Sequence, residues 1–279
     1  MANNLQYAAI FQAELDKAAK EQATSGWMEL NDKLVRYNSG SEVKIPMLDM
    51  DGLADYDRQT GFVEGSVDLT WQTKKMAMDR GRQFTFDEQE VNDTNFVLTA
   101  SSVMGEFQRT KVVPEIDAYR YSTLAALAAA KDRAVYGYTP EEATILKKLY
   151  ADLASIQDEV GDDTPLVITM STQVAALFDM NTTLARSVSP TDFRQGDITL
   201  KVKSLNGQHP IIRVGSGRLK TSYQFNDGTT ENQVKGGFTP AEDAQDINWI
   251  ICPRSAPIAV SRTDKVRIFD PETYQKKRA

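Results

Sequence analysis

The chain has 279 residues, of which 41% are hydrophobic and 25% charged. These fractions are typical of a folded globular protein, and the length favours two lobes over one compact domain. The net charge of -7 disfavours a surface that grips phosphates through clustered Lys and Arg. The single cysteine, Cys252, excludes an intrachain disulfide framework. No apolar run is long enough to span a membrane, so we expect a cytoplasmic product without a targeting segment.

The first segment predicts a short amphipathic arm. Tyr7, Phe11 and Leu15 recur at helical spacing, with charged and amide side chains between them. Such a helix can pack on its own domain or on a neighbouring molecule, and the sequence leaves both possibilities open. Gly26 and the Asn-Ser-Gly cluster at 38–40 then predict irregular chain before the first strand.

Residues 43–86 predict a long β-hairpin. Val67, Leu69 and Trp71 alternate with polar residues, as on a strand with one covered face. The Gly- and Asp-rich stretch 49–65 should form its tip. We expect the alternation to continue at Met76, Met78, Phe84 and Phe86. A leg of about 20 residues would reach on the order of 65 Å, whereas a compact chain of this length has a radius of gyration of about 19 Å.

A projecting ribbon needs a surface to lie on, because two strands alone are marginally stable in water. The alternative is that the two strands curl back into an ordinary sheet of the same chain. If the ribbon projects, its charged and aromatic side chains are candidates for contact with another subunit. These candidates are Arg58, Phe62, Trp71, Arg80 and Arg82. We expect the arginines to pair with acids of the neighbour and the aromatic rings to supply apolar contact.

Helices should follow the hairpin. Asn92 or Asp93 can cap a helix that ends at Pro114, and a second helix from Pro114 to Ala130 would continue it as a long rod. A third helix should begin with Thr139 as its N-cap and proline in its first turn. The apolar stripe of this third helix is Leu146, Leu149, Leu153 and Ile156.

A second lobe with alternating strands and helices comes next. Strands are predicted at 166–170, 198–202 and 211–214, with a helix at 171–178 and a turn at Asn206. The tail should return to strands at 249–252, 257–261 and 265–269. The fold class is therefore α+β.

Residues with catalytic or metal-binding chemistry are sparse. His209 is the only histidine and should lie in a solvated hairpin turn, while Cys252 should be an inert hydrophobe in an apolar strand. The acidic stretch from Asp49 to Asp57 does not place a glycine at the sixth position and a glutamate at the twelfth, as a calcium loop requires. We expect no catalytic residue, no cofactor and no metal. Because the chain has 39 acidic residues, a carboxylate-based hydrolase remains an alternative.

Four stretches resemble one protein family, and they follow one another in the order of that family's parts. The segments are 43–91 (extended loop), 112–125 (spine helix), and 200–221 with 235–272 (closing strands). Together they resemble the major capsid protein of tailed bacteriophages, which has the Hong Kong 97-type fold.

The resemblance implies a division of the chain into four parts. It assigns residues 1–42 to an N-terminal arm and 43–90 to an extended loop with its flanking strands. A peripheral domain with a long spine helix would take 91–133 and 248–279, and an axial α/β domain would take 134–247. The family's function would make the chain a structural subunit, without enzymatic activity, that assembles into pentamers and hexamers.

The resemblance also implies partners and a location. The shell would be an icosahedral head that contains double-stranded DNA without specific contacts, and the chain would belong to the virion after assembly in the host cytoplasm. Other copies of the chain, a separate scaffolding protein, and portal and other head proteins would be its partners, and no membrane would be involved. An encapsulin-like compartment of the same fold, which encloses cargo enzymes, is the alternative shell.

Overall fold

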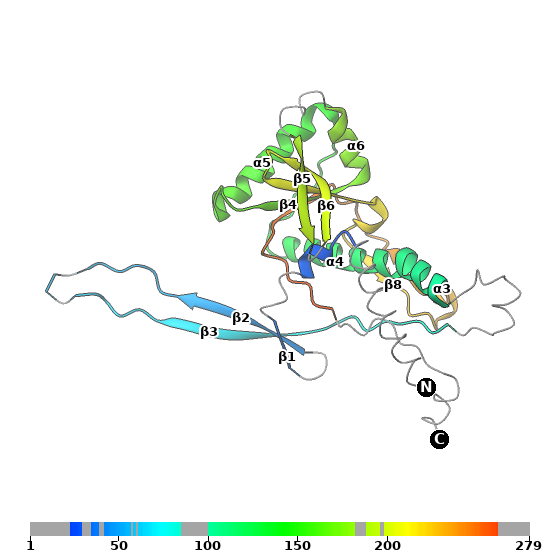
Figure 1. Ribbon diagram of the computed structural model, residues 1–279, viewed down its shortest axis with the longest axis horizontal. Coiled ribbons are helices and arrows are strands. Elements are labelled where there is room, and N and C mark those ends of the chain that lie inside the picture. The colour runs from blue at the N-terminus through cyan, green and yellow to red at the C-terminus, as the bar shows by residue number, and fades with distance from the viewer. Residues whose placement is uncertain are drawn as a thin grey trace, which may run out of the picture. The chain divides into compact units, whose positions relative to one another are not determined.

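The chain is a mixed α+β protein that divides into two units. The computed structural model describes residues 23–29, 35–38, 42–56, 58–59, 61–84, 100–181, 188–195 and 198–261. Unit 1 consists of Met1–Leu30 and Phe86–Ala279, and unit 2 of Asn31–Thr85. Figure 1 draws unit 2 in blue to cyan and most of unit 1 in green to orange.

Unit 2 is an antiparallel sheet in the order β1-β2-β3. Its strands are β1 (Arg36–Asn38), β2 (Glu42–Met50) and β3 (Val67–Lys75). The short β1 pairs only with residues 42–44 of β2, whereas β2 and β3 pair along their whole length. Most of the unit is therefore a two-stranded ribbon, and the predicted hairpin is confirmed, although β2 runs two residues into the predicted tip at 49–65.

The predicted length of this hairpin is wrong. β3 ends at Lys75, and residues 76–84, which include Met76, Met78 and Phe84, form no strand. β1 pairs with the edge of β2 that faces away from β3, so it offers these residues no partner strand. Phe86 lies outside the described residues. Nine paired residues span about 30 Å.

Unit 1 combines helices with a five-stranded sheet. Its helical elements are α3 (Ala100–Phe107), the π-helical segment η2 (Gln108–Val112), α4 (Val113–Ala129), α5 (Glu142–Val160), α6 (Thr172–Met180) and the 3-10 turns η4 (Ser216–Arg218) and η5 (Glu231–Gln233). Its strands are β4 (Leu166–Ser171), β5 (Val188–Gln195), β6 (Ile198–Leu205), β7 (His209–Val214), β8 (Tyr223–Phe225), β9 (Phe238–Pro240) and β10 (Trp249–Pro253). The sheet order is β10-β4-β7-β6-β5, and β8 pairs with β9 separately.

The interior strand β4 is buried at every position because helices cover both faces of the sheet. Leu166, Ile168 and Met170 point into a core shared with α5 and α6. Val167, between them, points to the other face and joins a second core with Tyr121 of α4. Figure 1 shows α5 and α6 on one side of the sheet and α4 on the other. A strand covered on both faces has a mostly apolar sequence, which is why β4 was predicted correctly from the sequence.

Two predicted helix boundaries are wrong. The helical run does not end at Pro114 but continues through η2 into α4, where Pro114 occupies the first turn. Pro114 cannot donate the N–H bond that a residue inside a continuous helix normally makes, and it lies directly after the π-helical segment, where Val113 N–H donates to Gln108 C=O five residues back. The N-cap of α5 is Glu141 rather than Thr139, and it makes no side-chain cap bond. The apolar stripe of α5 is confirmed at Leu149 and Leu153, which are buried.

Near the end of the chain, one predicted strand is confirmed and another is wrong. β10 forms as predicted and pairs with β4, so the predicted peripheral segment contributes an edge strand to the sheet of the predicted axial segment. No strand forms at 257–261; instead, Ala259 N–H donates to Met28 C=O at 3.1 Å. The strand predicted at 265–269 and the arm helix lie outside the described residues.

Candidate intersubunit surface

Unit 2 carries an apolar face that the register of its two strands creates. Residues directly opposite one another in an antiparallel pair place their side chains on the same face. Pro46 is paired with Trp71, Leu48 with Leu69, and Met50 with Val67. We call these six residues the apolar ribbon face.

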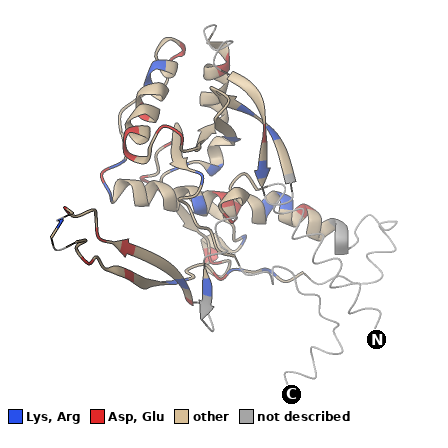
Figure 2. Cartoon of the chain, turned by 60° about the vertical axis from the view of Figure 1, so that its left-hand side comes forward, with Lys and Arg blue, Asp and Glu red and all other residues tan. Residues whose placement is uncertain are grey.

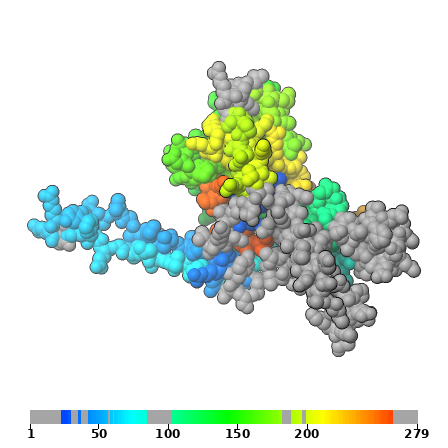
Figure 3. Space-filling model, in the orientation of Figure 1, coloured from blue at the N-terminus to red at the C-terminus, as the bar shows by residue number. Residues whose placement is uncertain are grey.

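The apolar ribbon face is open to solvent. Leu48 is 59% exposed, Leu69 57% and Val67 65%, and β3 is exposed at all nine positions. Figure 3 shows unit 2 as a slender double row of side chains coloured blue to cyan. In Figure 2 the strands are mostly tan, with separate red and blue positions. The opposite face of the same ribbon is more polar, because Asp49, Asp68, Thr70 and Gln72 lie there.

The tip continues the apolar surface. Phe62 is 87% exposed and packs against Tyr56 with ring centroids 4.9 Å apart. Leu53 is fully exposed. The tip is held at its base by Asp51, whose carboxylate accepts hydrogen bonds from the N–H and hydroxyl of Ser66 at 2.7 and 2.9 Å. These bonds lower the pKa of Asp51.

Such a surface is costly to leave in water. A monomeric protein rarely exposes a contiguous apolar patch without a binding role. Covering each large side chain completely would contribute roughly 1.5 to 3 kcal/mol. A ribbon of two strands has no second layer of its own to provide that cover, so the surface is suited to contact with another molecule.

The five predicted contact residues all lie in unit 2 and are exposed, but the structure does not gather them into one patch. Only Trp71 belongs to the apolar ribbon face, where the guanidinium of Arg36 lies 4.9 Å from its ring centroid. Arg58 and Phe62 are at the tip. Arg80 and Arg82 follow the end of β3.

The sequence pattern missed two members of this face, Leu48 and Met50. Apolar residues alternate in the sequence at Val43, Ile45 and Met47, but the register places Leu48 and Met50 with the apolar residues of β3. Val43 is only 5% exposed, at the base where β1 covers β2. Counting outward from a known tip pair, such as Asp51 with Ser66, would have revealed the register.

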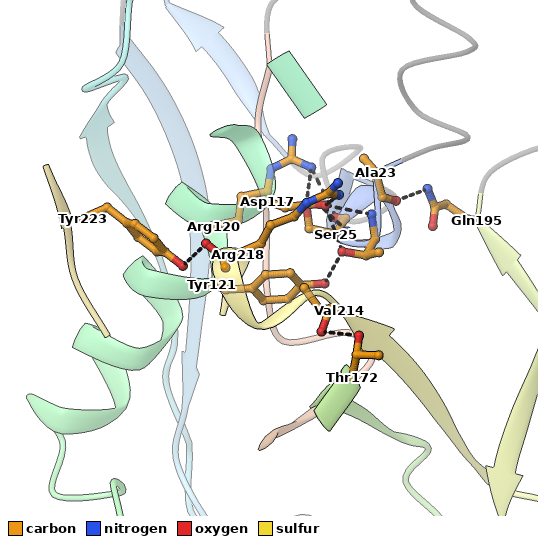
Figure 4. Close-up of polar contacts among 12 residues, drawn as sticks. Ala23, Ser25, Asp117, Arg120, Tyr121, Thr172, Gln195, Val214, Arg218 and Tyr223 are labelled. Carbon is orange, nitrogen blue, oxygen red and sulfur yellow. Dashed lines mark hydrogen bonds and ion pairs between the residues drawn. The ribbon is translucent and has the colours of Figure 1, made fainter. Parts of the chain in front are cut away.

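In unit 1, residues 23–29 are fastened to α4 by a buried carboxylate (Figure 4). Asp117 is fully buried and accepts hydrogen bonds from the N–H and hydroxyl groups of both Thr24 and Ser25. Arg218 adds an ion pair at 3.4 Å. Gln195 Nε2 donates to Ala23 C=O at 3.0 Å. We call this set of contacts the N-terminal anchor.

A second layer of contacts supports the anchor one helical turn further along. Arg120 pairs with Glu29, and both side chains are about nine-tenths buried. Ser261 also donates to Glu29, at 3.2 Å. Trp27 is buried in the core on the α4 side of the sheet, so polar and apolar contacts both hold the segment. The anchor could not be predicted from local sequence patterns, because its partners are more than 90 residues apart.

The two residues considered for chemistry lie in strands of unit 1. His209 is 2% exposed in β7, so the prediction of a solvated turn residue is wrong. Its Nδ1 accepts a hydrogen bond from Leu166 N–H at 3.3 Å, and burial lowers its pKa. Cys252 lies in the apolar strand β10, as predicted, and burial raises the pKa of its thiol to about 12. A thiol with so high a pKa is a poor nucleophile.

Acidic side chains provide no metal site in the described part of the chain. No group of His, Cys, Asp and Glu side chains there is placed to hold a metal ion. A pocket of about 190 Å³ is lined by Ser171, Gln173 and Asp246, among others. Asp246 is its single carboxylate and pairs with Lys220 at 2.6 Å. The pocket therefore lacks the pair of carboxylates that glycoside hydrolysis uses.

None of the helices in the described ranges has both the length and the apolar character needed to cross a bilayer. Comparisons with known proteins add no relative. A scan against models of protein families finds no match, and searches of curated proteins and of solved structures find no significant match.

Proposed function

We propose that this chain is a structural subunit that assembles with copies of itself into a closed shell. Specifically, we propose the major capsid protein of a tailed bacteriophage, with the Hong Kong 97-type fold and no enzymatic activity. The observation that carries the proposal is the apolar ribbon face, a contiguous exposed surface on two strands that lack a covering layer. A neighbouring subunit would supply that layer.

The order of the described elements supports the proposal. A ribbon is followed by the helical run from Ala100 to Ala129, then by the sheet with α5 and α6, and finally by the returning strand β10. The same order was expected from the resemblance: extended loop, spine helix, axial domain and return of the tail. The apolar ribbon face lies within the segment expected to be the extended loop.

Assembly would use many moderate contacts rather than one tight site. A stable interface between subunits typically buries about 1,200 to 2,000 Å². The exposed ribbon with its apolar tip would supply much of the surface that one subunit contributes to such an interface. Different surfaces of the same chain that meet head to tail close into rings when the rotation allows. Pentamers and hexamers would arise in this way, with a separate scaffolding protein and a portal completing the head.

The net charge of the chain bears on how the shell would interact with enclosed DNA. The chain carries a net charge of -7, so it would repel the phosphates of DNA rather than bind them tightly. We propose that double-stranded DNA is contained without specific contacts. The head would then belong to the virion, with the subunits assembled in the host cytoplasm.

Electron microscopy of the purified full-length chain tests the proposal. With and without the scaffolding protein, we expect rings, tubes or closed particles. A chain that stays monomeric under all these conditions would contradict it. The contents of particles isolated from the native source separate the two kinds of shell, because a phage head holds DNA and an encapsulin-like compartment holds protein cargo.

A further inference from the structure

Among the strands that the structure describes, none lies beside the outer edge of β3. It is the outermost strand of the unit 2 sheet, and all nine of its residues are exposed. An open edge presents unpaired N–H and C=O groups that can pair with another strand. No proline interrupts β3, so every position along this edge has both groups.

The other open edges among the described strands are short or contain proline: the outer strands β1 and β8 have only three residues each. β5 and β10 are the outer strands of the five-stranded sheet, and they contain Pro190 and Pro253, respectively. The outer edge of β2 is covered by β1 at 42–44 and then meets Pro46. Proline removes a donor and is a common means of blocking an edge. β3 is therefore the edge best suited to pairing.

The hydrogen-bond pattern of the hairpin decides which groups of β3 face outward. Asp51 N–H donates to Ser66 C=O at 3.2 Å, so this pair is hydrogen-bonded. Bonded and non-bonded pairs alternate in an antiparallel ladder, which makes the pair of Pro46 and Trp71, five positions away, a non-bonded one. Pro46 has no N–H to give, in agreement with this pattern. The residues whose N–H and C=O groups face the open edge are Val67, Leu69, Trp71, Thr73 and Lys75.

We propose that β3 pairs edge to edge with β3 of a second copy of this chain, antiparallel and about a twofold axis at Trp71. This register uses all nine residues of both strands, since Val67 lies opposite Lys75 and Leu69 opposite Thr73 of the second copy. The outward-facing groups of the two strands then meet. The result is a sheet with the strand order β2-β3-β3-β2, in which the apolar ribbon faces of both copies are continuous.

Charge favours this register. Asp68 lies directly opposite Asp49 in the hairpin, and like charges opposite one another are destabilising. Among the residues that the structure describes, neither carboxylate has an ion-pair partner. In the proposed register Lys74 of the second copy lies beside Asp68, and symmetry repeats the pair. Lysines near a strand end commonly oppose edge pairing, but here Lys74 meets an acid.

The pairing uses the same ribbon as the proposed function and rests on that proposal, because both require the chain to associate with copies of itself. It can nevertheless be tested apart from shell formation. Charge reversal in the full-length chain provides the test, with sedimentation equilibrium at low ionic strength as the measurement. We expect Asp68→Lys alone, or Lys74→Asp alone, to weaken dimerisation by on the order of tenfold, because two attractive pairs become repulsive. The double variant Asp68→Lys/Lys74→Asp restores both pairs and should dimerise like the wild type.

Disulfide trapping tests the register independently. Opposed residues of a hydrogen-bonded pair have Cα atoms about 5.5 Å apart, within the range for a disulfide. Trp71→Cys should therefore form a covalent dimer under mild oxidation. Thr73→Cys is the matched control, because it is also exposed on β3 but lies about 13 Å from its counterpart in this register. Cys252 should not compete, because burial raises its pKa to about 12.

The outcomes separate this pairing from the shell. A double variant no better than the single reversals, or a Thr73→Cys chain that crosslinks as fast as Trp71→Cys, overturns the pairing. Rescued dimers that never form particles under the electron microscope would contradict the shell proposal only. Particles built from a chain whose single reversals dimerise normally would contradict the edge pairing only.

Discussion

The carboxylate of Asp117 accepts hydrogen bonds from both the backbone N–H and the hydroxyl of Ser25, with donor–acceptor distances of 3.0 and 2.6 Å. Replacing Asp117 by Asn would put an amide NH₂ group among these donors and remove the charge that Arg218 faces. We expect Asp117→Asn to lower the free energy of unfolding by about 3 kcal/mol, as for other buried and paired charges. Urea denaturation measures this change.

Asp158→Asn is the matched control for that substitution. Asp158 is also in a helix, but it is exposed, so the same chemical change should alter stability by less than about 0.5 kcal/mol. Equal effects of the two substitutions would show that the anchor does not hold residues 23–29 in solution.

Burial of His209 should make the free energy of unfolding depend on pH. Its Nδ1 accepts a hydrogen bond from Leu166 N–H, and burial lowers its pKa below the ordinary value of about 6.5, although the nearby Asp162 opposes the shift. Below pH 6.5 the unfolded chain therefore binds more protons than the folded chain. The stability is complete above that pH and declines as the pH falls through 6.5 toward the lower folded pKa.

The variant His209→Asn isolates this contribution. Asparagine can place an acceptor near the position of Nδ1 but does not titrate. Measured by urea unfolding between pH 7.5 and 5, the wild type should lose more stability than the variant. Parallel curves for the two proteins would refute the assignment.

The apolar ribbon face predicts that neighbouring residues differ in their importance for assembly. Leu48 and Met47 are adjacent in β2 and similarly exposed, at 59% and 52%, but they lie on opposite faces. We expect Leu48→Ser to raise the concentration needed for assembly by on the order of tenfold, the loss of one covered apolar side chain. Met47→Ser should leave it nearly unchanged. Light scattering during assembly measures both, and a larger effect at Met47 would assign the contact to the other face.

We expect Arg80 and Arg82 to contribute to assembly through their charge. We expect Arg80→Glu combined with Arg82→Glu to impair particle formation, because acids of the neighbouring subunit would meet like charges. Both arginines are exposed, so the unfolding midpoint of the monomer should not change. Electron microscopy and thermal unfolding measure the two effects, and normal particles would remove these residues from the proposed contact.

Local sequence patterns predicted the elements that bury the most apolar area. Leu149 and Leu153 recur at helical spacing and are buried in α5, and the mostly apolar run from Leu166 to Met170 marks a strand covered on both sides. The tip of the ribbon was recognisable from its Gly and Asp residues. In these cases the spacing of apolar and polar residues in the sequence matches the burial and exposure of their side chains in the structure.

Features that depend on distant partners were not predictable. Whether Leu48 or Met47 joins the apolar ribbon face depends on which residue lies opposite Leu69, and alternation within one strand cannot reveal that. His209 follows a polar turn but is buried because β4 lies beside β7. Asp117 resembles any acid in a helix until Ser25, 92 positions away, is placed against it.

The π-helical segment η2 gives the long helical run one place that can absorb a change in length. Such a segment holds one more residue per turn than an α-helix would. Elsewhere in the run, loss of a residue rotates everything beyond it by about 100°, which would part Asp117 from Ser25. A deletion within 108–112 could instead convert the wide turns to ordinary ones and leave α4 in place. Length variation along this helix should therefore be tolerated at η2 before anywhere else.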